Sequence, residues 1–357
     1  MSHSPMPSSP AAMERGAYNR NSSVQESGSA PALPLFESAA RAVDLPAPPA
    51  PIVIADYGAS QGHNSFGPMA AAIRALRERT APEQAISIVH TDLPGNDFSA
   101  LFQALASDPQ SYLRADPYTF ASAVGRSFYE QLLPAASVTL GWSSWAVQWL
   151  SRAPAAIPDH VQVACSRDAA VKEQYLRQAA EDWRMFLRQR GRELRSGGRL
   201  VILTMALTDQ GDFGYRPVLA ALYGALQTLV DAGFLKAEEL HRMAVPTVGR
   251  GKSQLLAPFQ DGRFEGLEIE QAEVFLEPDA IWERYERDGD ASAFAARWAG
   301  FCRASVMPTL ALALDGASGA GREAEFLDRV EHGMARILAE KPEKSVIPLA
   351  SISLRKR

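Results

Sequence analysis

Short apolar runs alternate with amphipathic stretches along most of the chain. Apolar runs predict buried strands at residues 51–60, 85–93, 136–144 and 345–356. Helical spacing of apolar positions predicts helices at 35–43, 65–79, 98–106 and from 168 onward. The last of these is expected to stop at Gly197-Gly198, before a further strand that ends near 207. This alternation predicts an α/β fold with a mostly parallel sheet and helices on both faces.

The pattern changes between residues 205 and 310. Two apolar helical stretches, 218–235 and 290–314, have little strand alternation between them. We interpret this part as a helical cap over the carboxyl ends of the strands. The expected organisation is a disordered Ser/Pro/Ala-rich segment (1–12), a cofactor-binding α/β domain (13–204 and 311–357) and a cap (205–310).

Composition and charge exclude several classes of protein. The 357 residues are 46% hydrophobic and 22% charged, with a net charge of -5, which argues against a nucleic-acid partner. The sequence has no apolar run long enough for a membrane helix, and its start lacks the basic residues and apolar block of a secretory signal, so we expect neither. Cys165 and Cys302 are expected to be free thiols in the cytoplasm. The six His residues form no metal-binding motif, so no metal is expected.

The first strand ends in the turn "DYGASQGHN", which contains Asp56, Gly58, Ser60, Gly62 and Asn64. Its glycines have GxxxG spacing, whereas a dinucleotide pyrophosphate requires the GxGxxG turn. An acid before the first glycine and a hydroxyl between the two suit a cationic cofactor without phosphates, such as S-adenosylmethionine (SAM). An ordinary strand–helix connection is the alternative, since glycine-rich turns often follow strands.

The second strand ends in "HTDLPGNDF", with two acids around a Pro-Gly turn. An acid at this position of an open α/β sheet accepts hydrogen bonds from the ribose hydroxyls, which is the role we expect for Asp92. Leu93 is placed to pack on the adenine. Asp97 is expected to act only as a helix cap.

Three tryptophans at intervals of three and four, Trp142, Trp145 and Trp149, follow or end the third predicted strand. Taken alone, this stripe is typical of a buried helix face. His63 lies beside the first turn, and we expect a surface or hydrogen-bonded histidine there rather than a base.

Several segments together resemble the SABATH methyltransferases, the salicylate, benzoate and jasmonate carboxyl methyltransferases and their N-methylating relatives. The resemblance covers residue 13 to the end of the chain, and its ordered segments include "AYNRNSSVQ", "DLPGNDF", "RSFYEQLLP", "SSWAVQWLS" and "FCRASVMPTL". It implies a Rossmann-like class I methyltransferase sheet with a helical cap, SAM as cofactor, a small carboxylic acid as substrate, and often a homodimer.

The resemblance also implies roles for individual residues. The cofactor would be held by Tyr18, Asn21, Ser22, Asp56, Gly58, Ser60, Asn64, Asp92, Leu93, Ser127, Phe128 and Ser143. The substrate would be held by Gln25, Trp145, Gln148, Trp149 and Leu219. Gln25 and Trp149 would orient the substrate carboxylate, while Trp142 stays in the core.

The chain departs from the family pattern at three places. Trp145 stands where Tyr is usual, and Leu219 falls roughly where some members have a pocket Trp. The stretch "MAVPTVG" at 243–249 lacks the Phe-Asn pair that bears on a metal site in some members. The resemblance therefore gives no support for a structural magnesium ion.

A carboxylic acid is already ionised at pH 7, so its methylation needs alignment and exclusion of water rather than a general base. Two neutral donors, the Gln25 amide and the Trp149 indole, suffice to orient it. The leading hypothesis is a carboxyl O-methyltransferase for a small aromatic or isoprenoid acid. N-methylation of a small heterocycle, an NAD-type oxidoreductase and a non-catalytic SAM-binding protein remain as alternatives.

Overall fold

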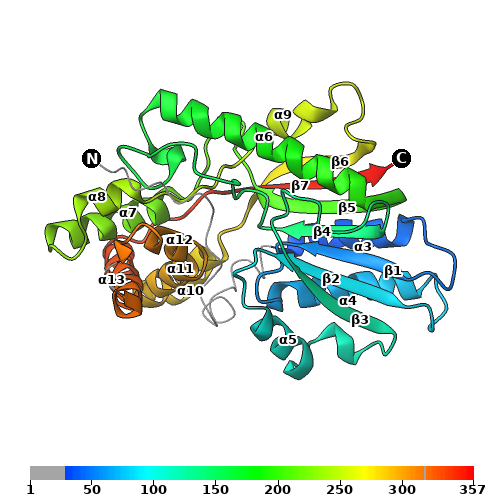
Figure 1. The fold of residues 1–357 in the computed structure, drawn as a ribbon. Coiled ribbons are helices and arrows are strands. Elements are labelled where there is room, and N and C mark those ends of the chain that lie inside the picture. Colours follow the sequence, from blue (N-terminus) through cyan, green and yellow to red (C-terminus); the bar gives the residue numbers. More distant parts are fainter. Residues whose placement is uncertain (1–28, 317–318) are drawn as a thin grey trace.

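The computed structural model describes residues 29–316 and 319–357, which contain one seven-stranded sheet (Figure 1). The strands are β1 (Ile52–Tyr57), β2 (Ile86–Asp92), β3 (Thr119–Gly125), β4 (Val138–Ser144), β5 (Leu194–Met205), β6 (Leu267–Glu277) and β7 (Ile347–Lys356). Their order across the sheet is β3-β2-β1-β4-β5-β7-β6. Strands β1 to β5 are parallel, and β7 is antiparallel to both of its neighbours. The predicted α/β class and mostly parallel sheet are confirmed.

The α-helices of the described residues are α3 (Leu33–Ala42), α4 (His63–Arg77), α5 (Phe98–Ser107), α6 (Ala169–Glu193), α7 (Arg216–Asp231), α8 (Ala237–Arg242), α9 (Lys252–Leu256), α10 (Ala280–Asp288), α11 (Ala291–Ser305), α12 (Met307–Ala311) and α13 (Gly319–Glu340). Short 3-10 helices are η1 (Ala30–Ala32), η2 (Tyr112–Arg114), η3 (Val163–Cys165) and η4 (Ala257–Phe259). All the helices expected from the sequence are therefore present.

Apolar side chains on both faces of the central strands build two layers of core. On β5, Val201 and Leu203 pack in one cluster with α3 and α4, whereas Leu200 and Ile202 pack in another with α6. Strands that are covered on both faces have continuous apolar sequences, which is why the central strands could be predicted. Figure 1 shows α6 on one side of the sheet and α3 and α4 on the other.

Helices α7, α8 and α10 to α13 gather at one end of the sheet, where β1 to β5 end and β7 begins (Figure 1). Helix α7 packs on α11 and α13, and α11 also packs on α13. The helical layer thus includes α13, which lies outside the predicted cap of 205–310.

Three details of the sequence interpretation are wrong. Strand β3 was not predicted, and β6 lies inside the segment expected to be helical but pairs along its length with β7. Helix α6 ends at Glu193, before the expected Gly-Gly stop. Gly197, with φ of 76°, lies instead inside β5, next to a register shift against β4.

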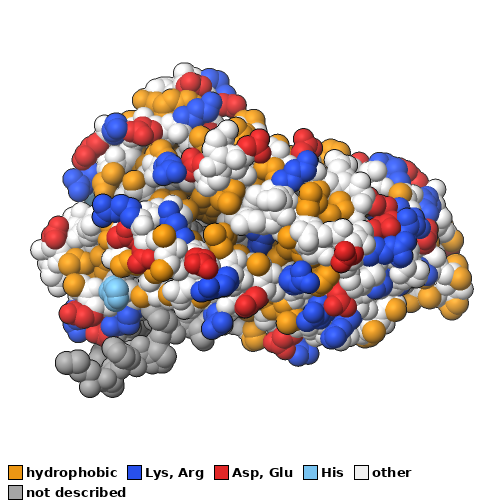
Figure 2. All heavy atoms as spheres, turned by 90° about the horizontal axis from the view of Figure 1, so that it is seen from above, with side chains coloured by type: hydrophobic (Ala, Val, Ile, Leu, Met, Phe, Trp, Pro, Cys, Tyr) orange, Lys and Arg blue, Asp and Glu red, His pale blue; other side chains and the backbone are white. Residues whose placement is uncertain are grey.

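Acidic and basic side chains intermingle on the face shown in Figure 2, without a region of one sign. Among the helices in 29–316 and 319–357, none combines the length and apolar character needed to cross a membrane.

Candidate active site

The sheet order reverses between β1 and β4, because the chain runs outward from β1 through β2 to β3 and then returns to β4. In open α/β sheets, ligands bind outside the carboxyl ends of the strands at such a switch point. The turn after β1 and the segment after β4 therefore define the place to look for a site.

The turn after β1 keeps its backbone close to the segment after β4. Gly58 has a φ of 88°, and a Cβ atom built on it would lie 2.4 Å from the Cβ of Ala146. Gly62 also has a φ of 88°, and Ser60 adopts the left-handed region at 50°. Only glycine fits position 58 without displacing Ala146, so glycine is what lets this turn and the segment after β4 pack so closely.

Asp92, the last residue of β2, is tied to this turn. Its carboxylate accepts hydrogen bonds from the backbone N–H groups of Ser60 and Leu93, both at 2.7 Å. Burial raises the pKa of Asp92 to about 6, and the two N–H groups oppose that shift. Asn96 donates to the Ser60 carbonyl at 2.7 Å and so holds the turn from the other side. The structure brings the predicted ribose acceptor and the predicted first loop into contact.

Asp56 is buried at the end of β1 and has partners within the protein. Its Oδ2 accepts from the Ser65 hydroxyl at 2.5 Å and lies 2.8 Å from His90 Nδ1. The other ring nitrogen of His90 lies 2.7 Å from the hydroxyl oxygen of Tyr112. Ser143 is also buried, and its hydroxyl donates to the Tyr57 carbonyl at 2.9 Å. In this geometry Asp56 and Ser143 brace the strand ends on which the site is built.

The segment after β3 joins the turn to the segment after β4. The Phe128 ring packs edge-on against Tyr129 and Phe186 and lies 3.9 Å from a Cβ atom built on Gly58. The hydroxyl of Tyr129 donates to the carbonyl of Trp149. Ser127, on the same segment, accepts from the Tyr129 N–H at 3.3 Å.

Residues 145–151, here called the clamp loop, leave β4 through a left-handed turn. Trp145 has a φ of 56° and donates its backbone N–H to the Leu203 carbonyl at 3.0 Å. Both polar atoms of the Gln148 side chain form hydrogen bonds within the protein. The amide nitrogen donates to the Trp145 carbonyl at 2.6 Å, and the amide oxygen accepts from the Thr204 hydroxyl at 3.1 Å. Gln148 therefore fixes the shape of the loop, and both atoms of its amide are already hydrogen-bonded.

Two buried charges hold the clamp loop from α6 and from the segment after α8. Arg250 donates to the Val147 carbonyl at 2.7 Å. Asp182 accepts from the backbone N–H and the hydroxyl of Ser151, at 2.8 and 2.7 Å. No sequence motif marked Arg250 or Asp182, because each acts through contacts between segments far apart in the chain.

A small cavity of about 60 Å³, here called the inner pocket, lies against the clamp loop. It brings together all four described residues expected to contact the substrate, namely Trp145, Gln148, Trp149 and Leu219. The sequence interpretation missed the rest of its wall, which comes from β5, the segment before α7, the segment after α8 and the end of α11, including Met205, Phe213, Tyr215, Phe301 and Cys302. These residues share no local pattern.

Several other predicted residues lie beside the site or in the core. Asp97 caps α5 by accepting from the Ala100 N–H at 3.0 Å, and His63 pairs with Asp108 at 3.1 Å, as expected. Trp142 is buried against Phe36 in the core, with ring centroids 4.7 Å apart. Asn64 lies in the first turn of α4. Tyr18, Asn21, Ser22 and Gln25 lie outside the described residues.

Comparison with known proteins identifies the class to which this fold and site belong. A family model described as SAM dependent carboxyl methyltransferase matches residues 11–357, so the chain belongs to that family. The predicted family, enzyme class and SAM cofactor are thereby confirmed, and the oxidoreductase alternative is wrong.

Individual relatives agree with this assignment. A salicylate carboxymethyltransferase of Clarkia breweri is 29% identical over 252 residues, which cover 67% of each protein. A 3,7-dimethylxanthine N-methyltransferase of Camellia sinensis var. assamica is 28% identical over 282 residues, covering 72% of this chain and 76% of that protein. The solved structure of a loganic acid methyltransferase with SAH has the same fold, with a TM-score of 0.75 and 21% identity over 98% of this chain and 99% of the other. The predicted class I methyltransferase fold is confirmed.

The residues present fit SAM. The left-handed turn from Gly58 to Gly62, the half-buried Asp92 acceptor tied to it and the Phe128 ring beside it offer separate contacts for a flat, hydroxylated and cationic molecule. Within the described residues, no group of three metal-ligating side chains is found.

Proposed function

We propose that this protein methylates a small aromatic or isoprenoid carboxylic acid to its methyl ester. The observation that carries the proposal is the inner pocket, an apolar and aromatic cavity bounded by the clamp loop, which itself abuts the glycine turn at Gly58. A flat or branched apolar acid matches such a wall, and its carboxylate would face the clamp loop.

SAM supplies the methyl group as a sulfonium. For the chain's own residues we propose that Asp92 accepts from the ribose hydroxyls, Leu93 and Phe128 flank the adenine, and the turn at Gly58 and Ser60 receives the amino-acid end. Trp149 would donate its indole N–H to the substrate carboxylate, together with Gln25. We further propose that Tyr18, Asn21, Ser22, Asn64 and Ser127 contact the cofactor and that Trp145, Gln148 and Leu219 line the substrate pocket. Asp56 and Ser143 would support the cofactor through the strand ends that they brace.

The pocket's chemistry favours methylation without a general base. Among the described residues that line the inner pocket, none is Asp, Glu, His, Lys or Arg. Burial raises the pKa of the Cys302 thiol to about 12, so it stays protonated at neutral pH. A carboxylate needs no proton removed, and holding its oxygen about 3 to 3.5 Å from the methyl carbon supplies much of the rate. Neutral donors also avoid overstabilising the ground state.

N-methylation of a heterocycle is the second candidate, and the likeness to the xanthine N-methyltransferase favours it. A ring N–H must lose its proton during methylation, and the described wall of the inner pocket offers no ordinary base for that step. The carboxylic acid therefore remains the better substrate for this site.

We also propose how the chain is divided and assembled. Residues 205–310 would cover the substrate as a cap over an α/β domain of 13–204 and 311–357, with β6 of that segment contributing to the sheet. A homodimer in the cytoplasm is the proposed assembly and location.

Mass spectrometry of reactions with SAM tests the function directly. The acids are benzoate, salicylate, anthranilate, cinnamate, indole-acetate, jasmonate and farnesoate. A product heavier by one methylene, and returned to the acid by mild alkali, supports a methyl ester and identifies the substrate class. Tight SAM binding with no product from any acid would contradict carboxyl methylation and favour the N-methyl or non-catalytic alternative.

A further inference from the structure

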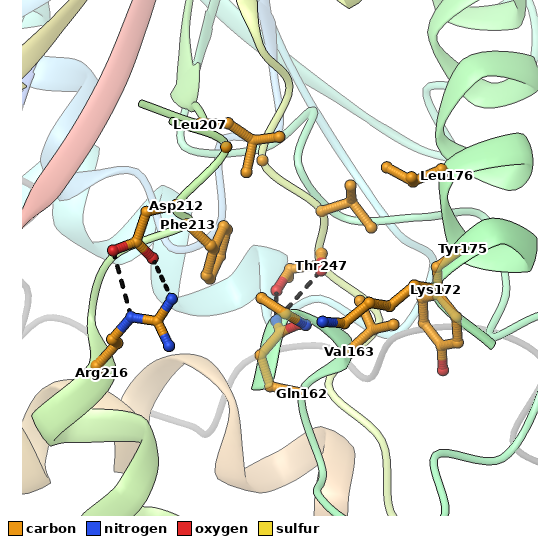
Figure 3. A pocket seen from close by; sticks show the side chains of 14 residues that line it. Gln162, Val163, Lys172, Tyr175, Leu176, Leu207, Asp212, Phe213, Arg216 and Thr247 are labelled. Carbon is orange, nitrogen blue, oxygen red and sulfur yellow. Dashed lines mark hydrogen bonds and ion pairs between the residues drawn. The ribbon is translucent and has the colours of Figure 1, made fainter. Parts of the chain in front are cut away.

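A second cavity, here called the outer pocket, lies next to the inner pocket and has a volume of about 160 Å³ (Figure 3). Its lining comes from η3, the first turns of α6 and the segment between β5 and α7. Apolar side chains such as Val163 and Leu207 form much of its wall, and Leu176 on its rim is exposed.

The two pockets share a wall. Gln162, Phe213 and Thr247 line both of them. Gln162 donates to the hydroxyl of Thr247 at 2.7 Å and to its carbonyl at 3.2 Å, and its own amide oxygen accepts from the Ala164 N–H at 3.0 Å. The boundary between the pockets therefore consists of one aromatic ring and one hydrogen-bonded pair of side chains.

The charged groups of the outer pocket differ in their pairing. Arg216 is neutralised by Asp212, with N–O distances of 3.0 and 3.2 Å. The ammonium of Lys172 has no hydrogen-bond or ion-pair partner in residues 29–316 and 319–357. Figure 3 shows this side chain extending across the pocket toward Gln162. The outer pocket thus carries one uncompensated positive charge beside an apolar wall.

We infer that the inner and outer pockets together bind an elongated acid with a second anionic group at its far end. The reacting carboxylate faces Trp149, and the distal carboxylate pairs with Lys172. The apolar spacer crosses the shared wall beside Phe213, whose ring must turn aside to admit it. This inference rests on the proposed carboxyl methylation and specifies its substrate class.

Each turnover of such an acid transfers one methyl group. One carboxylate oxygen forms the O–CH3 bond while the S–CH3 bond breaks, and the electron pair of that bond stays on sulfur. No proton moves. The distal carboxylate, held by Lys172, remains ionised, so the product is a monomethyl ester. A charged end of this kind is costly to bury without a cation, which makes Lys172 the specificity-determining residue.

The test compares octanedioate, dodecanedioate and hexadecanedioate with the monocarboxylic acids of the same lengths. The ratio of kcat/KM for diacid to monoacid is measured in the unaltered protein, in Lys172→Met and in Arg177→Met. Arg177 lies on the same helix, pairs with Glu173 at 3.1 Å and lines neither pocket. We expect the ratio at the best-fitting length to fall about tenfold in Lys172→Met, as for loss of a charged hydrogen bond, and to stay constant in Arg177→Met.

Calorimetric titration of the same diacids, without turnover, keeps the inference separate from the proposed function. If no acid is methylated, carboxyl methylation fails, yet weaker diacid binding to Lys172→Met than to Arg177→Met would still support the two-pocket site. Equal ratios and equal affinities in the two variants would overturn it. Ala164→Phe, which fills the outer pocket, is expected to reduce activity on the longest diacids most.

Discussion

The buried guanidinium of Arg250 donates to the backbone carbonyl of Val147 at 2.7 Å, across 103 positions of sequence. It also donates twice to the Ala179 carbonyl of α6, at 2.9 and 3.3 Å. One side chain therefore ties the clamp loop to the long helix behind it. Burial lowers the pKa of Arg250, and the nearby Tyr129 and Asp182 oppose that shift only in part.

Arg250→Lys should keep the charge but lose the planar fork that reaches both carbonyls. We expect kcat/KM for the acid to fall roughly tenfold to a hundredfold, since hydrogen bonds to charged groups contribute about 1.5–3 kcal/mol. The cofactor's Kd should change little, because Asp92 and Asn96 still hold the glycine turn from its other side. Arg188→Lys, at an exposed pair with Glu265, is the control. A proportional loss of cofactor affinity would mean that Arg250 acts on the whole fold rather than on the loop.

Cofactor binding should depend on pH through Asp92. Its pKa of about 6 means that the carboxylate is ionised above that pH and protonated below it. We expect affinity for SAM to weaken as pH falls through 6, by up to about tenfold per unit, because the neutral acid is a poorer acceptor for two hydroxyls. Calorimetry between pH 5 and 8 measures this, and Asp92→Asn should bind weakly with a flat profile over the same range.

The raised pKa of Asp92 also has a consequence for stability. The folded chain holds this proton more tightly than the unfolded chain, where the ordinary pKa is 3.8. The contribution of Asp92 to the free energy of unfolding is therefore greatest below 3.8 and is lost as pH rises toward 6. Asp92→Asn should remove this part of the pH dependence of thermal unfolding.

Trp149→Phe removes the indole N–H and keeps an aromatic wall. If the indole orients the carboxylate, kcat should fall by about a hundredfold, or about 2.7 kcal/mol in the barrier, with unchanged SAM affinity. Gln25→Ala is expected to have the same signature. Trp142→Phe, in the core against Phe36, is the control and should lower stability more than kcat. Wild-type rates in both Trp149→Phe and Gln25→Ala would rule out the proposed clamp.

Gly58→Ala adds a methyl group where φ is 88° and the Cβ of Ala146 would be 2.4 Å away. We expect a loss of about 2 kcal/mol in the free energy of unfolding and at least a tenfold loss of SAM affinity, from strain and a displaced loop. Gly262→Ala separates the two causes, because Gly262 has a similar φ of 85° with nothing within 4 Å. Denaturant titration and calorimetry should show a smaller stability loss there and normal SAM binding.

Strands covered on both faces were predictable, whereas the two edge strands were not. Strand β3 alternates small and exposed residues, including Phe120, and so lacks an apolar run. Strand β6 does alternate, but a register shift between Ile269 and Gln271 breaks the period of two, and its many acids resemble an exposed helix.

In the candidate site, too, some residues were predictable from the sequence and others were not. Short motifs predicted Asp92 and the glycine turn, because those contacts are local or lie on neighbouring parallel strands. The wall at Phe213 and Cys302 comes from segments about ninety residues apart, and its assembly depends on how α7 and α11 pack. Hydrophobic periodicity gives no information about contacts between distant segments, so the substrate could not be derived from the sequence.

Strand β7 lies between β5 and β6, and β6 has no other neighbour in the sheet. During synthesis β6 leaves the ribosome well before β7, because α10 to α13 lie between them in the chain. The backbone N–H and C=O groups of β6 therefore have no strand to pair with until β7 emerges. Until then β5 also presents an open, apolar edge, which is where a nascent or truncated chain would aggregate. The strand that completes the sheet is thus the last of its seven strands to be synthesised, and two strand edges stay unpaired until it appears.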